Sequence, residues 1–138
     1  MTTRQPASHR TIRWRCGSLR SERGSASIEM VILMPVLFGI LFLGVQAAMY
    51  YYAGTIALAA AQDGARAQAG TDADPDTGTR TATAILAASD GSLENWAATT
   101  TISADTATVT VTGTSLSVIP GWHPTVTKVA TAPVERLT

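Results

Sequence analysis

The sequence has 138 residues and a formal net charge of zero at pH 7. This length allows one small domain beside a membrane segment, since a much smaller hydrophobic core is marginal. Its single cysteine, Cys16, excludes an intramolecular disulfide.

The charges are distributed unevenly along the chain. Residues 1–24 contain six arginines and one glutamate, whereas residues 25–138 contain four basic and nine acidic residues. A basic flank on one side of a single apolar span predicts a cytoplasmic N-terminus and an extracytoplasmic C-terminus. We therefore interpret residues 1–24 as a basic cytoplasmic leader, and we expect no nucleic-acid partner for it.

A long uncharged segment follows the leader. Met30–Met49 holds twenty residues without a charged side chain, enough for a helix to cross the roughly 30 Å hydrocarbon core of a bilayer. Tyr50–Tyr52 then form an aromatic belt of the kind found where a helix leaves the membrane. We therefore expect a transmembrane and stalk helix over residues 25–70, in contact with membrane lipid, in a single-pass protein of the cell membrane.

Two features of this helix concern its packing. Pro35 removes a backbone donor and predicts a helix kink, which is either a harmless bend or a point where the helix yields on leaving the bilayer. Small residues, which let helices approach closely, recur at intervals of four in two series. They either form a contact surface for another subunit's helix or seat the protein's own sheet. The small residues are Gly44, Ala48, Ala53, Ala57, Ala61, Ala65 and Ala69.

The junction before the apolar segment reads Arg23-Gly24-Ser25-Ala26-Ser27-Ile28-Glu29. A basic leader, a glycine, and a glutamate just before an apolar run form the pattern of type IV prepilins. On this pattern, and with Pro35 inside the run, the chain resembles the TadE-like minor pilins (pseudopilins) of tight-adherence (Tad/Flp) type IV pilus systems. The resemblance implies cleavage between Gly24 and Ser25 by a prepilin peptidase. It also implies other pilin-like subunits, an ATPase and a pilus assembly platform as partners.

Such a cut has a physical consequence for Glu29. A carboxylate in lipid is costly, about 2.5–3.5 kcal/mol near a helix centre and less near its end. Cleavage would create an α-amino group at Ser25, one helical turn away, which can neutralise Glu29 in the same chain or in the next subunit. The alternative is a glutamate among the lipid headgroups with no further role.

Residues 71–138 are expected to form a small extracytoplasmic head of the α+β class. The change from helical to alternating periodicity predicts one short helix and about three antiparallel strands. A change of face after the second strand predicts a bulge at Gly113. The expected elements are Thr79–Ser89, Thr99–Ser103, Ala107–Thr112 and Thr125–Val134.

The head has few large apolar residues, so we expect its sheet to share a core with the stalk helix near residues 56–69. The expected core residues of the head are Ile85, Leu86, Trp96, Ile102, Val109, Val111, Leu116, Val118, Val126 and Val129.

Catalytic or metal-binding patterns are not apparent. His9 and His123 lie far apart, and no His, Cys and Asp residues have metal-ligand spacing. Asp72, Asp74 and Asp76 alternate like the first ligands of a calcium loop, but the glycine and glutamate that this loop requires are missing. We therefore expect a structural protein with no enzymatic activity, no cofactor and no metal.

Two other functions remain open on the sequence alone. The first is that of a permanently membrane-anchored exported protein whose β-rich head binds a ligand or the cell wall. The second is that of a secreted protein released at an Ala-x-Ala site such as residues 57–59, although the apolar run is too long for an ordinary signal peptide.

Overall fold

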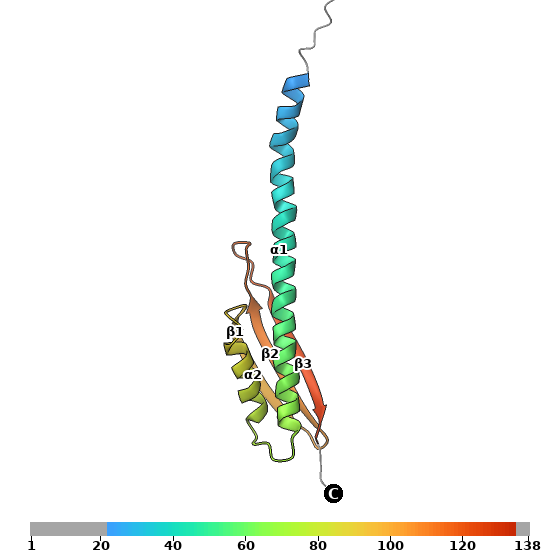
Figure 1. Cartoon of the computed structure of the whole chain (residues 1–138), viewed down its shortest axis with the longest axis vertical. Coiled ribbons are helices and arrows are strands. Elements are labelled where there is room, and N and C mark those ends of the chain that lie inside the picture. The colour runs from blue at the N-terminus through green and yellow to red at the C-terminus, as the bar shows by residue number, and fades with distance from the viewer. Residues whose placement is uncertain (1–21, 135–138) are drawn as a thin grey trace, which may run out of the picture. The chain divides into compact units, whose positions relative to one another are not determined.

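The chain folds into two helices and one antiparallel sheet. The computed structural model describes the backbone of residues 22–134 and the side chains of residues 28–134 (Figure 1). The predicted α+β class, with a long helix, a short helix and three strands, is confirmed. Residues 1–21, most of the predicted leader, lie outside the described residues. The elements are α1 (Glu22–Ala69), α2 (Thr77–Ala87), β1 (Leu93–Ile102), β2 (Thr106–Ser115) and β3 (Thr125–Pro133).

The chain divides into two compact units, Met1–Val36 and Leu37–Thr138. The described part of the first unit is helical, and its large apolar side chains from Ile28 onward are exposed. Among the described residues, one helix is long and apolar enough to cross a membrane, over Ile28–Ala69 of α1. Pro35 lies inside α1, and the kink predicted there stays a prediction.

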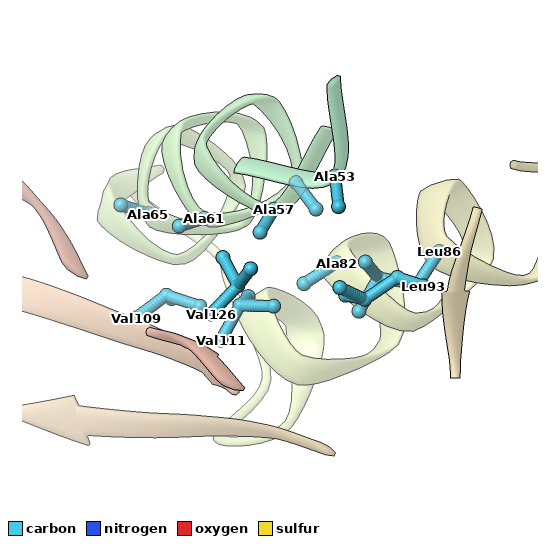
Figure 2. Packing of buried hydrophobic residues seen from close by; sticks show 11 residues of the cluster. Ala53, Ala57, Ala61, Ala65, Ala82, Leu86, Leu93, Val109, Val111 and Val126 are labelled. Carbon is cyan, nitrogen blue, oxygen red and sulfur yellow. The ribbon is translucent and has the colours of Figure 1, made fainter. Parts of the chain in front are cut away.

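The second unit has two layers. The sheet has the order β1-β2-β3, and buried side chains from α1 and α2 pack together with its inner face (Figure 2). The central strand β2 alternates as predicted: Ala107, Val109 and Val111 are buried, and the threonines between them are less buried. Val109 lies opposite Thr100 of β1 and Ala130 of β3.

The irregularity of the sheet lies on β1, opposite Gly113, so the bulge predicted at Gly113 was placed on the wrong strand. The pairing of β1 with β2 shifts between Glu94 and Ala97, while β2 pairs with β3 regularly through Gly113. Asn95, inside the shift, has a φ of 48°, a backbone conformation that asparagine tolerates better than most residues. Odd-numbered residues of β2 stay buried up to Ser115, where the strand ends, so no change of face occurs within it.

The core contains fewer of the head's large residues than expected. Leu86, Val109, Val111 and Val126 are buried, and Ile85 and Trp96 pack partly buried against them. Ile102 and Val129, both predicted in the core, are 52% and 53% exposed. Val129 faces outward because the buried Val126 sets the alternation of β3, so that even-numbered residues point inward.

Alanines of α1 supply the other side of this core. Ala53, Ala57 and Ala61 have no exposed surface, and Ala65 has 1% (Figure 2). They belong to the same buried cluster as Ala82 of α2 and the valines of β2 and β3. The expectation that the sheet borrows a hydrophobic wall from the stalk helix agrees with this packing.

Candidate functional site

Glu29 lies where the apolar stretch of α1 begins. Its side chain is exposed, and its neighbours Ile28 and Met30 are exposed apolar residues. Gly24 and Ser25 lie in the first turn of α1, so the bond between them is part of helical backbone. Because proteases bind extended substrates, cleavage at this bond requires the first turn of α1 to unwind.

Gln46 is a polar side chain inside the apolar segment, and it is 2% exposed. Its Nε2 donates a hydrogen bond to the carbonyl oxygen of Leu116 at 3.3 Å. Its Oε1 accepts hydrogen bonds from the backbone N–H of Val118 at 2.9 Å and from the Ser117 hydroxyl at 3.1 Å. Gln46 therefore ties α1 to residues 116–124, the β2–β3 loop.

An apolar groove opens beside this contact, with a volume of about 470 Å³. Trp122 of the β2–β3 loop lines this groove and is 48% exposed. The rest of the wall comes mainly from α1. The lining residues are Leu43, Gln46, Ala47, Tyr50, Trp122, Pro124 and Thr125.

At the other end of α1, two glycines bring α1 and α2 close together. A Cβ atom added at Gly64 would lie 2.7 Å from the carbonyl oxygen of Gly78 and 3.2 Å from the Cβ of Ala82. A Cβ added at Gly78 would lie 3.0 Å from the carbonyl oxygen of Gly64. The helix backbones are therefore in direct contact, and a side chain at either position would separate them.

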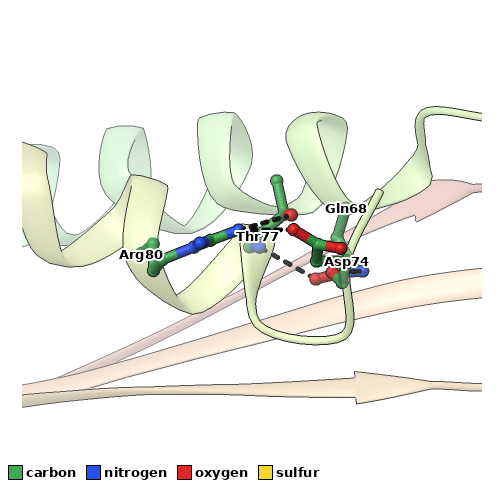
Figure 3. A network of polar contacts seen from close by, with 5 residues as sticks. Gln68, Asp74, Thr77 and Arg80 are labelled. Carbon is green, nitrogen blue, oxygen red and sulfur yellow. Dashed lines mark hydrogen bonds and ion pairs between the residues drawn. The ribbon is translucent and has the colours of Figure 1, made fainter. Parts of the chain in front are cut away.

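Gln68 connects the same two helices through the turn between them (Figure 3). Its Nε2 donates to the carbonyl oxygen of Asp74 at 2.9 Å, and its Oε1 accepts from the backbone N–H of Gly78 at 2.8 Å. The Asp74 carboxylate forms an ion pair with Arg80 at 3.1 Å. In the part of the chain that the structure describes, no group of three His, Cys, Asp or Glu side chains is placed to hold a metal ion.

The small residues of α1 separate into two groups. Ala53, Ala57 and Ala61 are buried against the protein's own sheet, the second of the two alternatives drawn from the sequence. Gly44 and Ala48 are exposed, and a Cβ added at Gly44 would meet no atom within 4 Å. Of these five residues, Gly44 and Ala48 are the ones available to another helix.

The comparison with protein families concerns the same helix. Residues 24–66 match the family model described as TadE-like protein. This TadE-like domain match covers 43 of the chain's 138 residues. The resemblance seen in the sequence is thereby confirmed. No curated protein and no solved structure matches the chain.

The TadE-like domain lies within α1, and α2 and the three strands lie beyond the match. It contains Glu29, Gln46 and the glycine that contacts α2, Gly64. At its C-terminal end Arg66 forms an ion pair with Asp63 at 2.7 Å. Both side chains are largely exposed, so this pair contributes little to stability.

Gln46, whose side chain joins α1 to the β2–β3 loop, is a residue that sequence reasoning missed. Its signal is visible in the sequence: it is the one amide side chain between Met30 and Met49. A polar residue in a membrane helix usually faces protein or water, not lipid. Its partners lie 70 to 72 residues further along the chain, where no local pattern indicates them.

Proposed function

We propose that this protein is a pilin-like structural and assembly subunit of a tight-adherence (type IV-like) pilus, processed by a prepilin peptidase after Gly24. Its N-terminus is cytoplasmic and its head lies outside the membrane. The TadE-like domain carries this proposal, because the match begins at Gly24 and includes Glu29 and the apolar helix. The partners are the prepilin peptidase, other pilin-like subunits and the pilus assembly platform.

The surface of α1 supports a role in lateral assembly. From Ile28 to Val45 its large apolar side chains are exposed, so nothing in the described part of the chain covers them. Such a surface is stable in lipid, or against the same surface of neighbouring subunits. Glu29 lies at the start of this surface, where a new α-amino group at Ser25 of the same or an adjacent subunit would pair with it.

Replacement of Glu29 tests this role. We expect Glu29→Gln to reduce the yield of surface fibres while export and membrane insertion persist, because the neutral amide cannot form an ion pair with the amino group. The matched control is Glu94→Gln, which makes the same change at an exposed position of β1. Normal fibre yield from Glu29→Gln would contradict the assembly role.

N-terminal sequencing of the protein from the membrane fraction tests the processing step. A chain that begins at Ser25 supports the pilin-like function. A chain that begins at Met1 or Thr2 contradicts processing and favours a permanently anchored protein with a ligand-binding head. A chain that begins near Ala60 favours a secreted protein.

A further inference from the structure

The β2–β3 loop, residues 116–124, contacts α1 on the apolar side of the tyrosine cluster Tyr50–Tyr52. Gln46, which binds this loop, precedes Tyr50 by one helical turn. The α1 side chains just before Gln46, Leu43 and Val45, are exposed and apolar. If tyrosines mark the level of the headgroups, this loop reaches the upper part of the hydrocarbon layer.

The composition of the β2–β3 loop suits that position. The loop reads Leu-Ser-Val-Ile-Pro-Gly-Trp-His-Pro and contains no Asp, Glu, Lys or Arg. Val118 is 38% exposed and Trp122 is 48% exposed. Tryptophan is enriched at membrane interfaces, where its ring contacts acyl chains and its N–H reaches water or headgroups.

Several backbone polar groups of the loop form hydrogen bonds within the protein. The N–H of Val118 and the carbonyl oxygen of Leu116 bond to Gln46. The N–H of Ile119 bonds to the Ser117 hydroxyl at 3.1 Å, and that of Trp122 bonds to the carbonyl oxygen of Ile119 at 3.2 Å. Backbone groups of an irregular loop that lack a protein partner need water or headgroups, which the membrane interface supplies. Gln46 thus bonds to two backbone groups and one hydroxyl of the loop, and these bonds engage both polar atoms of its amide.

Two hollows lie beside Tyr50, one of them apolar and the other with a lysine in its wall. The 470 Å³ groove beside Trp122 is lined mostly by apolar side chains and is continuous with the exposed apolar surface of α1 through Leu43. A second hollow of about 200 Å³ also includes Tyr50, and Lys128 forms part of its wall. The Cε of Lys128 lies 3.5 Å from the place of a Cβ at Gly54, one turn beyond Tyr50.

We propose that the β2–β3 loop is a second membrane contact, which inserts into the leaflet next to the head. A phospholipid acyl chain occupies the groove beside Trp122, and Lys128 binds the phosphate of the headgroup. This arrangement holds the head against the bilayer at two places, α1 and the loop. It depends on α1 being a membrane span and not on the pilin-like function.

The depth of Trp122 in a bilayer tests the proposal. The full chain carrying Trp14→Phe and Trp96→Phe, reconstituted in phosphatidylcholine and phosphatidylglycerol vesicles, keeps Trp122 as its single tryptophan. We expect blue-shifted emission, loss of fluorescence with lipids brominated near the headgroup end of the acyl chain, and little quenching by aqueous iodide.

A control variant places the single tryptophan far from the membrane. It carries Trp14→Phe, Trp96→Phe, Trp122→Phe and Asp72→Trp, which puts the probe at an exposed position in the turn between α1 and α2. This probe should be quenched by iodide and not by brominated lipid. The proposal is overturned if Trp122 behaves like this control. It is also overturned if Trp122 is shielded from both quenchers only at high protein-to-lipid ratios, since a second copy of the chain then occupies the groove.

Two further variants test the parts played by Gln46 and Lys128. Gln46→Leu should move Trp122 toward water, with more iodide quenching, because the loop loses its hydrogen bonds to α1. Lys128→Gln should reduce the phospholipid retained after mild detergent extraction, as measured by native mass spectrometry, whereas Arg66→Gln at the distal end of α1 should not. Equal lipid retention in Lys128→Gln and the unmodified chain would overturn the assignment of the phosphate to Lys128.

Discussion

Gln46 accepts a hydrogen bond from the backbone N–H of Val118 at 2.9 Å, which joins the apolar part of α1 to the β2–β3 loop. The same amide group bonds to Leu116 and Ser117, so one side chain holds three consecutive residues of the loop. The first prediction follows from this contact.

Gln46→Leu should lower the free energy of unfolding of the head by about 1–3 kcal/mol, because it removes three partly buried hydrogen bonds and leaves the N–H of Val118 without its partner. Denaturant unfolding of the full chain in mild detergent, followed by circular dichroism, measures the change. Gln62→Leu is the control, since Gln62 is exposed on the same helix. An equal effect of the two substitutions would show that the hydrogen bonds of Gln46 do not stabilise the head.

Gly64→Ala should destabilise the protein by about 1–3 kcal/mol, because the added methyl group overlaps the backbone of α2 and separates the helices. The nearest atom, the carbonyl oxygen of Gly78, would lie 2.7 Å from the new Cβ. Gly44→Ala is the matched control, with no atom within 4 Å of its new Cβ. Thermal unfolding of the two variants compares them, and a Gly64→Ala protein as stable as the Gly44→Ala protein would argue against the close contact.

Gly113→Ala should also destabilise the head, since its Cβ would lie 2.6 Å from the Cγ of Leu93. Leu93 is buried and would be displaced from the core. If this overlap is the cause, the effects of Gly113→Ala and Leu93→Ala should not add, because the smaller side chain removes the clash. A double-mutant cycle of unfolding free energies measures this coupling, and additive effects would exclude it.

A fragment that begins at Thr71 should be unfolded by circular dichroism, because it lacks the alanine side of the core. In the intact chain Ala53, Ala57 and Ala61 are fully buried in the cluster that contains the valines of the sheet. A fragment that begins at Gln46 keeps these alanines and should melt cooperatively. A cooperative melt from the shorter fragment would contradict the shared core.

Much of the fold was predictable because local patterns encode it. The apolar run and the small residues indicate α1, and the alternation of valine and threonine indicates β2. The third strand was predicted over Thr125–Val134 and observed over Thr125–Pro133. The helix predicted over Thr79–Ser89 was observed two residues earlier, over Thr77–Ala87.

Other features depend on contacts that no local pattern contains. β1 begins at Leu93, earlier than predicted, because the bulge near Asn95 interrupts the alternation that marks a strand. Alanines at intervals of four fit an intramolecular and an intermolecular contact equally well, so only the three-dimensional structure could separate them. Gln46 was missed because its partners are distant in the sequence.

The alanine contact between α1 and the sheet also determines how the head responds to mechanical load. Ala53, Ala57, Ala61 and Ala65 are buried along several turns of one helix. A force along the axis of α1 loads these turns simultaneously, in shear, so they resist together and are not peeled apart one after another. A force applied to α1 would therefore move the head together with the helix, without separating the two.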